Sequence, residues 1–438
     1  MSKSKLLDKP SGTYRVIHSA DWHLGKLLVD LSREEEHERF LSFLLKLIQD
    51  EEVDALVIAG DIFDSSNPPQ SALARYYNFL SELYRTTTCS VVVIAGNHDS
   101  PAQLEAPREV LNTLRVRVLG AMPDNGADVL VTLPEEGEPQ LIVAAVPFLR
   151  DRDVRTGQSG QTAAEIQKDL VAGIRKRYED AAQAAQDLNL KVPVLATGHL
   201  TVAGSFTSES EREIHVGGLG AVGADLFPDS FSYVALGHLH RPQAAGGREM
   251  VRYSGSPIPL SFSEAGDAKE MRRLDFANGE LIQSLPVSIP MYRHLVQLNC
   301  KRGELEEKMR SFRAPVAEFP TWVEVMVADP VFGENLFEIV QDYAKSEDYV
   351  VIRVAGKRVS GLQGLSEGAE PGEDIESSIL DNPKEVFKVR LEREDGLSEA
   401  EKVAVVTVFD ELINLYDEGN RGEDLELTQA VEEKDEQK

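Results

Sequence analysis

Short motifs that contain carboxylate, imidazole and amide side chains recur along the chain, each directly after an apolar run. In the stretch VVVIAGNHDS the apolar residues end at Gly96, and Asn97, His98 and Asp99 follow. Such groups are costly to remove from water unless they are paired or bound. Four other runs end in the same way, giving Asp21 and His23 in ADWHLG, Asp61 and Asp64 in GDIFDS, His199 in GHL, and His238 and His240 in GHLH.

These residue types favour a metal site that acts on phosphate esters. Two divalent cations about 3.5–4 Å apart can clamp a phosphate ester, activate water and stabilise the leaving oxygen. The pair needs a bridging carboxylate, for which Asp61 is the candidate. Imidazoles mixed with a few oxygens suit Mn²⁺ better than Mg²⁺, which is the alternative. We expect His98, beside the ligand Asn97, to donate a proton or stabilise the transition state. Asp64 and Asp99 are expected to orient neighbouring ligands.

Each motif taken alone has a simpler explanation, because a histidine near a strand end is most often only hydrogen-bonded. The GDIFD motif could be a turn capped by an aspartate side chain. Five such motifs in order, each after an apolar run, favour one composite site. Other residues have other expected roles: His18 structural within a strand, His37 solvated on a helix, His215 a weaker candidate for the site, and Cys89 in the core.

Apolar runs alternate with helical patterns over residues 1–290, which predicts an α/β domain. Ser32 with Glu35 predicts a capping box at the start of one helix, and another helix is expected near 162–187. Several of the expected strands are rich in Val and Ile without polar alternation, as in strands buried on both faces. The expected strands are 14–20, 55–61, 90–96, 141–147, 192–198, 232–237 and 250–255.

The rest of the chain is predicted to form a smaller unit and a C-terminal extension. Residues 291–360 show the order strand, helix, strand, helix, strand. Residues 361–383, rich in Gly, Glu and Ser, are expected to be a linker. Residues 384–419 are expected to be helical, with an apolar face at 405–416 that needs a partner to cover it. Residues 420–438 are expected to be an acidic, disordered tail.

Composition limits the classes of function. The 438 residues, 42% apolar, suffice for two or three domains. Two cysteines argue against a disulfide scaffold or a thiolate metal site and fit a reducing compartment. No stretch approaches the roughly 20 apolar residues of a membrane span, so we expect a cytoplasmic protein. The net charge of −28 weakens a nucleic-acid function without excluding it, because phosphate contacts are made by local patches.

The series DWHLG, GDIFD, GNHD, GHL and GHLH resembles the calcineurin-like metallophosphoesterase superfamily. The stretches AGDIFDSSNPP, GNHDS, VALGHLHRPQ and YSGSPIPLSFSE narrow the resemblance to the SbcD subunits of bacterial SbcCD nucleases, relatives of the double-strand-break repair nucleases. The resemblance implies a four-layer αββα sandwich at 1–290 and a small α/β capping domain at 291–360. It implies one cation held by Asp21, His23, Asp61 and His240, a second held by Asp61, Asn97, His199 and His238, and His98 as the catalytic histidine.

The resemblance also implies partners. Residues 384–417 would dock on the coiled-coil base of the ATPase subunit SbcC, and helices near 71–84 and 103–114 would form a homodimer, which gives a heterotetramer with SbcC. No GxxxxGK[ST] phosphate loop occurs, so ATP hydrolysis would belong to SbcC. The implied activity is a Mn²⁺-dependent DNA phosphodiesterase, both double-strand exonuclease and single-strand endonuclease, in DNA repair, recombination and hairpin processing.

Two other functions fit parts of the sequence. A metallophosphoesterase for nucleotides or phosphoproteins would use the same motifs, which describe the reaction and not the leaving group. The capping unit and docking helices favour DNA instead. A non-catalytic scaffold would not need a complete ligand set, which argues against that class. The candidates for DNA contacts are the basic residues Lys26, Arg150, Arg152 and Arg241.

Overall fold

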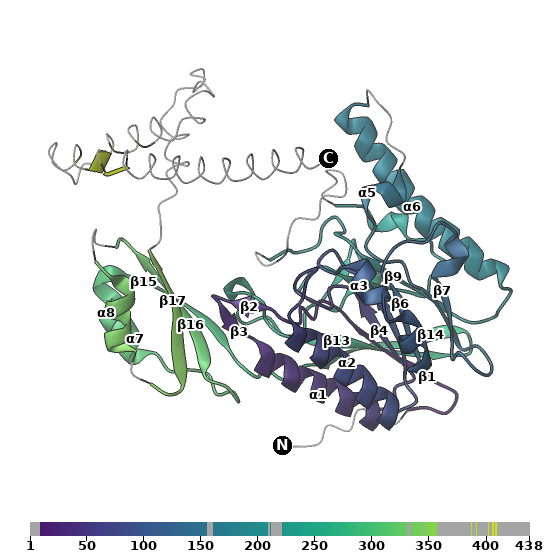
Figure 1. Cartoon of the computed structure of the whole chain (residues 1–438), viewed down its shortest axis with the longest axis horizontal. Helices are drawn as coiled ribbons and strands as arrows, with labels where there is room; N and C mark the ends of the chain where they lie inside the picture. Colours follow the sequence, from purple (N-terminus) through teal and green to yellow (C-terminus); the bar gives the residue numbers. More distant parts are fainter. Residues whose placement is uncertain are drawn as a thin grey trace, which may run out of the picture. The chain divides into compact units, whose positions relative to one another are not determined.

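The computed structural model describes residues 9–155, 161–208, 211, 221–330, 334–344 and 346–356, and single positions between 387 and 409. The chain divides into two units, Met1–Gly356 and Lys357–Lys438 (Figure 1). His215, the expected linker, most of the expected docking helices and the tail lie outside the described residues. Among the described residues, no helix is long and apolar enough to cross a membrane.

The first unit contains two six-stranded sheets, and the first sheet has the order β14-β13-β1-β4-β5-β6. In it β1, β4, β5 and β6 are parallel neighbours, whereas β13 and β14 extend the sheet antiparallel beside β1. Every residue of β1, β4 and β5 is buried, which confirms the expectation of strands covered on both faces. The bounds are β1 Tyr14–Ser19, β4 Ala55–Ala59, β5 Ser90–Ile94, β6 Val116–Leu119, β13 Glu270–Ala277 and β14 Glu280–Ser288.

The second sheet has the order β11-β12-β10-β9-β8-β7. Its four inner strands are parallel, and β7 and β11 are antiparallel edge strands. The bounds are β7 Leu130–Leu133, β8 Leu141–Ala144, β9 Val194–His199, β10 Tyr233–Gly237, β11 Gln243–Ala245 and β12 Arg248–Tyr253.

The two sheets face each other across a shared apolar core, and helices cover their outer faces. Val57 of the first sheet and Leu195 of the second belong to the same buried cluster. Helices α1 (Glu34–Asp50) and α2 (Gln70–Thr86) pack on the first sheet, and α6 (Ala163–Asp187) packs on the second (Figure 1). This arrangement is the αββα sandwich that was predicted, with the layers held by apolar side chains on both sides of each sheet.

Two predictions about α1 are wrong. Arg33 is its N-cap residue and its side chain makes no cap hydrogen bond, so the Ser32–Glu35 capping box is absent; Ser32 Oγ instead accepts from Glu34 N at 3.2 Å. His37 is 1% exposed and not solvated. It lies one turn before Phe40, which packs edge-on against Trp22, and so it shares the buried face of the helix.

The helix expected at 103–114 is two short helices, α3 (Pro101–Glu105) and α4 (Arg108–Thr113). Pro107 is the N-cap of α4, and proline in a helix interior would remove a backbone hydrogen bond and clash with the preceding turn. The remaining elements of this part are β2 Leu27–Leu28, β3 Leu31–Ser32, α5 Asp151–Val154, and the 3₁₀ turns η1 Gly126–Val129, η2 Ala224–Leu226 and η3 Phe262–Glu264.

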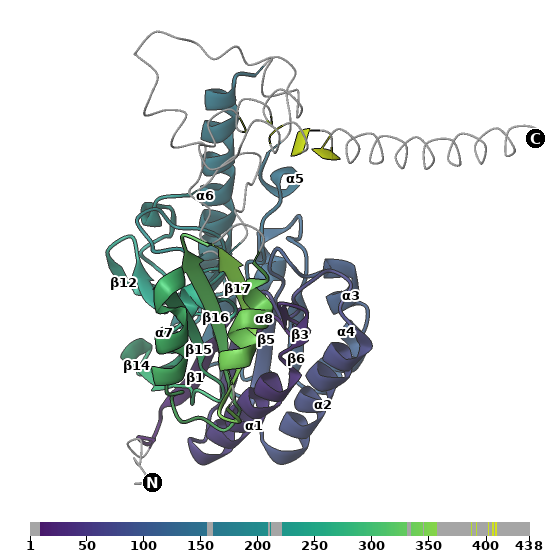
Figure 2. The ribbon, with the colours of Figure 1, turned by 90° about the vertical axis from the view of Figure 1, so that its left-hand side faces the viewer.

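Residues 295–356 contain a three-stranded parallel sheet with the order β15-β16-β17 (Figure 2). The order of strands and helices is the one expected from the sequence. Apolar residues of the sheet and of α7 and α8 form a separate core around Val323, Val325 and Met309. The bounds are β15 Leu295–Lys301, η4 Arg302–Glu304, α7 Leu305–Ser311, β16 Thr321–Ala328, α8 Leu336–Tyr343 and β17 Tyr349–Gly356.

A buried junction joins this small sheet to α1. The guanidinium of Arg293 lies 4.4 Å from the ring centre of Trp322 and 5.1 Å from that of Phe319. Its Nε donates to Glu36 Oε2 at 3.2 Å. Cation–π contacts and a buried, fully paired charge are both stronger away from water. The junction therefore gives the small sheet a fixed attachment on the sandwich.

Candidate metal centre

The polar motifs lie where the parallel strands of both sheets end. Asp21 and His23 follow β1, Asp61 and Asp64 follow β4, and Asn97, His98 and Asp99 follow β5, which are neighbours in the first sheet. His199 ends β9, and His238 and His240 follow its neighbour β10 in the second sheet. Because parallel neighbours end at the same edge of a sheet, the five loops meet.

Four of these residues have left-handed backbone conformations, with φ of +54° at Asp21, +46° at His23, +50° at Asp61 and +102° at His238. A non-glycine residue in this region costs of order 1–3 kcal/mol and persists only where the surroundings fix it. Here Asp21 N donates to Gly60 O and His23 N donates to Asp61 O, both at 3.0 Å. The loops after β1 and β4 thus hold each other in shape.

Asp21, Asp61 and His199 form one group whose ligand atoms all lie within 4.8 Å of one another. His199 Nε2 is 3.2 Å from Asp61 Oδ2, and His199 Nδ1 is 3.9 Å from Asp21 Oδ1. Asn97 joins this group, because its Oδ1 lies 2.9 Å from His199 Nε2. Carboxylate, amide and imidazole atoms are thus brought together in a buried space.

His23, Asp64 and His98 form a second group of the same kind. His23 Nδ1 is 3.3 Å from Asp64 Oδ1, and His23 Nε2 is 3.6 Å from Asp61 Oδ2. The ring of His98 packs edge-on against that of His23 at 4.8 Å. Since Asp61 Oδ2 approaches His23 on one side and His199 on the other, Asp61 has the position that a bridging carboxylate needs.

The histidines of the loop after β10 contact both groups. The ring of His238 lies 5.5 Å from that of His199, and the ring of His240 lies 5.1 Å from that of His23. His238 N donates to Asp21 Oδ1 at 2.8 Å. Asp21 lies within reach of His199, and His23 lies within reach of Asp61 and Asp64.

Glycines at the strand ends leave room for the carboxylates. A Cβ on Gly96 would overlap the Asp61 carboxylate, and a Cβ on Gly60 would overlap the His199 ring. Asp99 fixes the same loops from behind: it accepts from the backbone N–H of Gly96 at 2.9 Å, and from those of Phe63 and Ile62 at 3.0 and 3.2 Å. These hydrogen bonds from Asp99 fix the backbone of the loops that follow β4 and β5.

The carboxylates and the His199 imidazole shift one another's pKa values. Burial raises the pKa of Asp21 well above its ordinary value. Burial acts on Asp61 in the same direction, but the imidazole of His199 lowers the pKa of Asp61 below its ordinary range. Burial lowers the pKa of His199, but Asp61 and then Asp21 raise it to about 9. The carboxylates thus draw positive charge into the site, which is the charge that divalent cations would supply.

Three other histidines are held neutral. Burial lowers the pKa of His23 and of His240, and lowers that of His238 well below its ordinary value. A histidine binds a metal through a neutral ring nitrogen. These imidazoles are therefore in the protonation state that a cation requires.

Unpaired buried atoms show that the residues fit divalent cations. Among the described residues, Asp21 Oδ2 and His23 Nε2 are buried without a hydrogen-bond partner. Buried polar atoms are nearly always paired, and such exceptions often mark a bound ion. A mixed set of carboxylate, imidazole and amide donors at two adjacent groups suits two such cations.

Sequence reasoning missed two carboxylates that hold His240. Glu264 Oε1 lies 3.1 Å from His240 Nδ1, and Glu211 Oε1 accepts from His240 N at 2.7 Å. Neither stands at the end of a strand that leads into the site, so the motif pattern gave no signal for them.

The basic residues proposed for DNA contacts differ in their surroundings. Lys26 Nζ lies 3.0 Å from Asp64 Oδ1, and Arg241 makes two hydrogen bonds to Asp267 at 2.8 and 3.1 Å. Arg150 lies over the ring of Phe148, and Arg152 is 74% exposed in its side chain.

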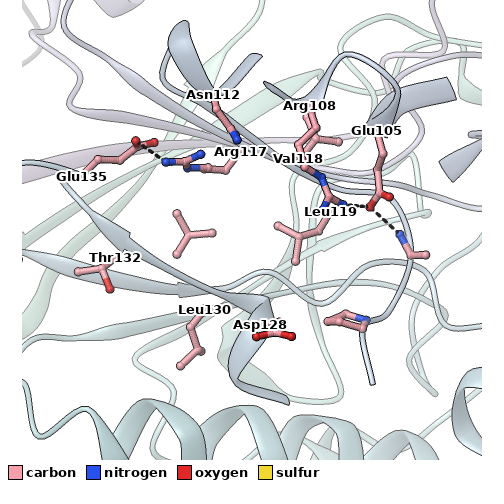
Figure 3. A pocket seen from close by; sticks show the side chains of 13 residues that line it. Glu105, Arg108, Asn112, Arg117, Val118, Leu119, Asp128, Leu130, Thr132 and Glu135 are labelled. Atoms are coloured by element: carbon pink, nitrogen blue, oxygen red, sulfur yellow. Dashed lines mark hydrogen bonds and ion pairs between the residues drawn. The ribbon is translucent and has the colours of Figure 1, made fainter. Parts of the chain in front are cut away.

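A cavity of about 550 Å³ lies between the edge strands β6 and β7 and beside α3 and α4 (Figure 3). Arg117 pairs with Glu135, and Arg108 pairs with Glu105, each at 2.7 Å. None of the candidate metal ligands lines this cavity. It is therefore separate from the metal centre.

Comparison with known proteins agrees with this geometry. Residues 14–242 match the model of the calcineurin-like phosphoesterase family. The chain is 37% identical over 352 residues to the SbcD subunit of the SbcCD nuclease of Escherichia coli K12, covering 78% of this chain and 85% of the relative. The values are 36% over 378 residues, 82% and 91%, for the SbcD subunit of Rhodobacter capsulatus, and 34% over 329 residues, 74% and 82%, for that of Bacillus subtilis. The chain belongs to the SbcD family of SbcCD nuclease subunits, within the calcineurin-like phosphoesterases.

Proposed function

We propose that this protein is a metal-dependent DNA phosphodiesterase, the nuclease subunit of an SbcCD-type complex that acts in DNA repair. The observation that carries the proposal is the pair of adjacent donor groups joined by Asp61, in a chain whose relatives are named nuclease subunits. The proposed activities are exonuclease cleavage of double-stranded DNA and endonuclease cleavage of single-stranded DNA.

The site would hold two divalent cations. We propose Mn²⁺ because four of the proposed ligands are imidazoles. When bound, such cations supply positive charge to a phosphodiester and lower the pKa of water. The proposed ligands are Asp21, His23, Asp61, Asn97, His199, His238 and His240. Asp61 would bridge, since its second oxygen is already fixed by the N–H of His98 at 2.9 Å.

His98 is the proposed catalytic residue. Its Nδ1 lies 2.7 Å from the carbonyl oxygen of Asp64, which can only accept, so Nδ1 carries a proton and the ring is held in one orientation. His98 is 7% exposed, more than His23, His199 or His240. This position would let it stabilise charge on the phosphate or protonate the leaving oxygen.

The remaining proposals concern the assembly. The small sheet and its helices would act as the capping domain that presents DNA. Residues 384–417 would dock on the coiled-coil base of an SbcC-type ATPase; the described rings of Phe387 and Phe409 stack at 3.8 Å, which supports an apolar contact within this segment. Helices α2, α3 and α4 would form a homodimer, and the complex would be a heterotetramer.

The test compares cleavage of linear double-stranded DNA by the wild type and by His98→Ala in the presence of Mn²⁺. Each protein is assayed alone and with the coiled-coil ATPase plus ATP, and bis-p-nitrophenyl phosphate serves as the small substrate. We expect a loss of about 10²- to 10⁴-fold for His98→Ala. Bound metal, measured by mass spectrometry, should not change, because His98 lies in the donor group of His23 and Asp64 but is not one of the seven proposed ligands.

His294→Ala is the matched control, because His294 precedes β15 and is not part of either donor group. It should cleave DNA like the wild type. If the wild type hydrolyses only the small ester and leaves DNA intact even beside the ATPase, the proposal is wrong. A phosphoesterase for nucleotides or phosphoproteins would then take its place.

A further inference from the structure

Glu264, the last residue of the turn η3, forms a buried ion pair with Lys269 that the motifs did not reveal. Glu264 is fully buried and Lys269 is 3% exposed. Lys269 Nζ makes a short hydrogen bond to Glu264 Oε2. The same oxygen accepts from Leu260 N at 3.2 Å. Burying a carboxylate is costly unless its oxygens are paired. Here the Lys269 ammonium and the Leu260 N–H pair with Oε2.

The other oxygen of Glu264 faces the metal centre. Glu264 Oε1 lies 3.1 Å from His240 Nδ1. Lys269 Nζ also donates to the backbone oxygen of His240 at 3.1 Å, and to Ser256 Oγ at 2.9 Å. Thus the ion pair holds His240 at two points, the ring and the backbone, and restricts the rotation of its side chain.

The contact determines which ring nitrogen can bind a cation. Glu264 Oε2 is occupied by the ammonium of Lys269 and the N–H of Leu260, so Oε1 is the oxygen that accepts from the His240 ring. The proton of His240 is therefore on Nδ1, and Nε2 carries the lone pair. The ring itself packs 5.1 Å from that of His23, inside the site.

The turn η3 also packs against the small sheet. Phe262, two residues before Glu264, packs in one buried cluster with Leu295 and Trp322 of the small sheet. The position of the Glu264 carboxylate therefore depends on the contact between η3 and the small sheet.

We propose that Glu264 is a positioning residue, which orients the His240 imidazole and fixes its tautomer for cation binding, with Lys269 as its counter-ion. The inference rests on the proposed function in taking His240 to be a ligand. A metal-binding histidine whose second nitrogen donates to a carboxylate is better oriented and more basic, and loss of such a partner lowers metal affinity about 10- to 100-fold.

The experiment measures Mn²⁺ binding to the full chain by electron paramagnetic resonance, without DNA. Glu264→Gln removes the charge at constant size, and Glu264→Asp keeps the charge on a shorter side chain. Glu36→Gln is the matched control, a buried glutamate paired with Arg33 and Arg293 at the junction. Thermal unfolding without metal reports the structural effect of each change.

We expect Glu264→Gln to weaken one of the two cations about 10- to 100-fold, and Glu264→Asp to weaken the same cation less. Ester cleavage by Glu264→Gln should recover at high Mn²⁺, which a merely structural defect would not do. Glu36→Gln should lower the unfolding temperature but bind both cations like the wild type.

Wild-type affinity for both cations in Glu264→Gln would overturn the inference. If Glu264→Gln does not fold, the affinity of Glu264→Asp decides, and wild-type binding by that variant overturns it equally. Failure of the proposed function is separate: a wild type that binds both cations but leaves DNA intact would reject the nuclease while the affinity comparison stands.

Discussion

Replacing Gly96 with alanine should abolish tight cation binding while the fold survives. The added Cβ would lie 2.1 Å from Asp61 Oδ1 and 2.4 Å from the backbone nitrogen of Asp61, whereas ordinary contacts begin at 3.4 Å, so Asp61 and its backbone must move by at least about 1 Å. Metal ligand distances tolerate only about 0.2 Å. Because Asp61 is the proposed bridge, both cations should be affected, by at least about 10- to 100-fold in affinity, as for loss of an orienting contact.

The free energy of unfolding should fall by about 3 kcal/mol, the upper end of the usual cost of overpacking, because one of the overlapping atoms belongs to the backbone. Mn²⁺ titration of the full chain and thermal unfolding without metal measure the two effects separately. Gly303→Ala is the control, because a Cβ there meets nothing within 4 Å. If Gly96→Ala binds two Mn²⁺ ions with wild-type affinity, Asp61 does not bridge them and the geometric reasoning fails.

Two further predictions concern stability. Burial lowers the pKa of His18 to about 3, so its contribution to stability is complete above pH 6.5 and is lost as the pH falls toward 3, because only the unfolded chain takes up the proton. His18→Gln should remove about 2 kcal/mol of the loss in the free energy of unfolding between pH 6.5 and 4.5, measured by urea unfolding; parallel curves for both proteins would contradict this. Arg293→Met should lower the free energy of unfolding by about 3 kcal/mol, because it breaks a buried ion pair. Arg85→Met, in an exposed pair, should lower it by less than about 1 kcal/mol. Equal unfolding temperatures for the two variants would contradict a stabilising role of the junction.

The gathering of the donor residues could be predicted from the sequence because each follows a buried parallel strand. Once β1, β4 and β5 are neighbours, and β9 and β10 are neighbours, the loops after them must meet. The sequence could not show that Asp21 lies with His199, since that depends on how the two sheets face each other.

Strands β13 and β14 were not predicted, because charged residues interrupt their apolar pattern. Arg272, Arg273 and Asp275 are nevertheless buried, and Asp275 pairs with Arg15 of β1 at 2.8 Å. Such pairing joins residues 260 positions apart and leaves no local signal. Glu264 was missed for the same reason, as its partner His240 lies 24 residues away.

The two tryptophans of the chain are optical reporters of different places. Trp22 lies between Asp21 and His23 in the sequence, with its Nε1 donating to Ser19 Oγ at 2.9 Å. Trp322 lies against the guanidinium of Arg293 at the junction. Replacing either with phenylalanine would leave a single tryptophan, so tryptophan fluorescence could follow the metal centre and the attachment of the small sheet separately in one unlabelled protein.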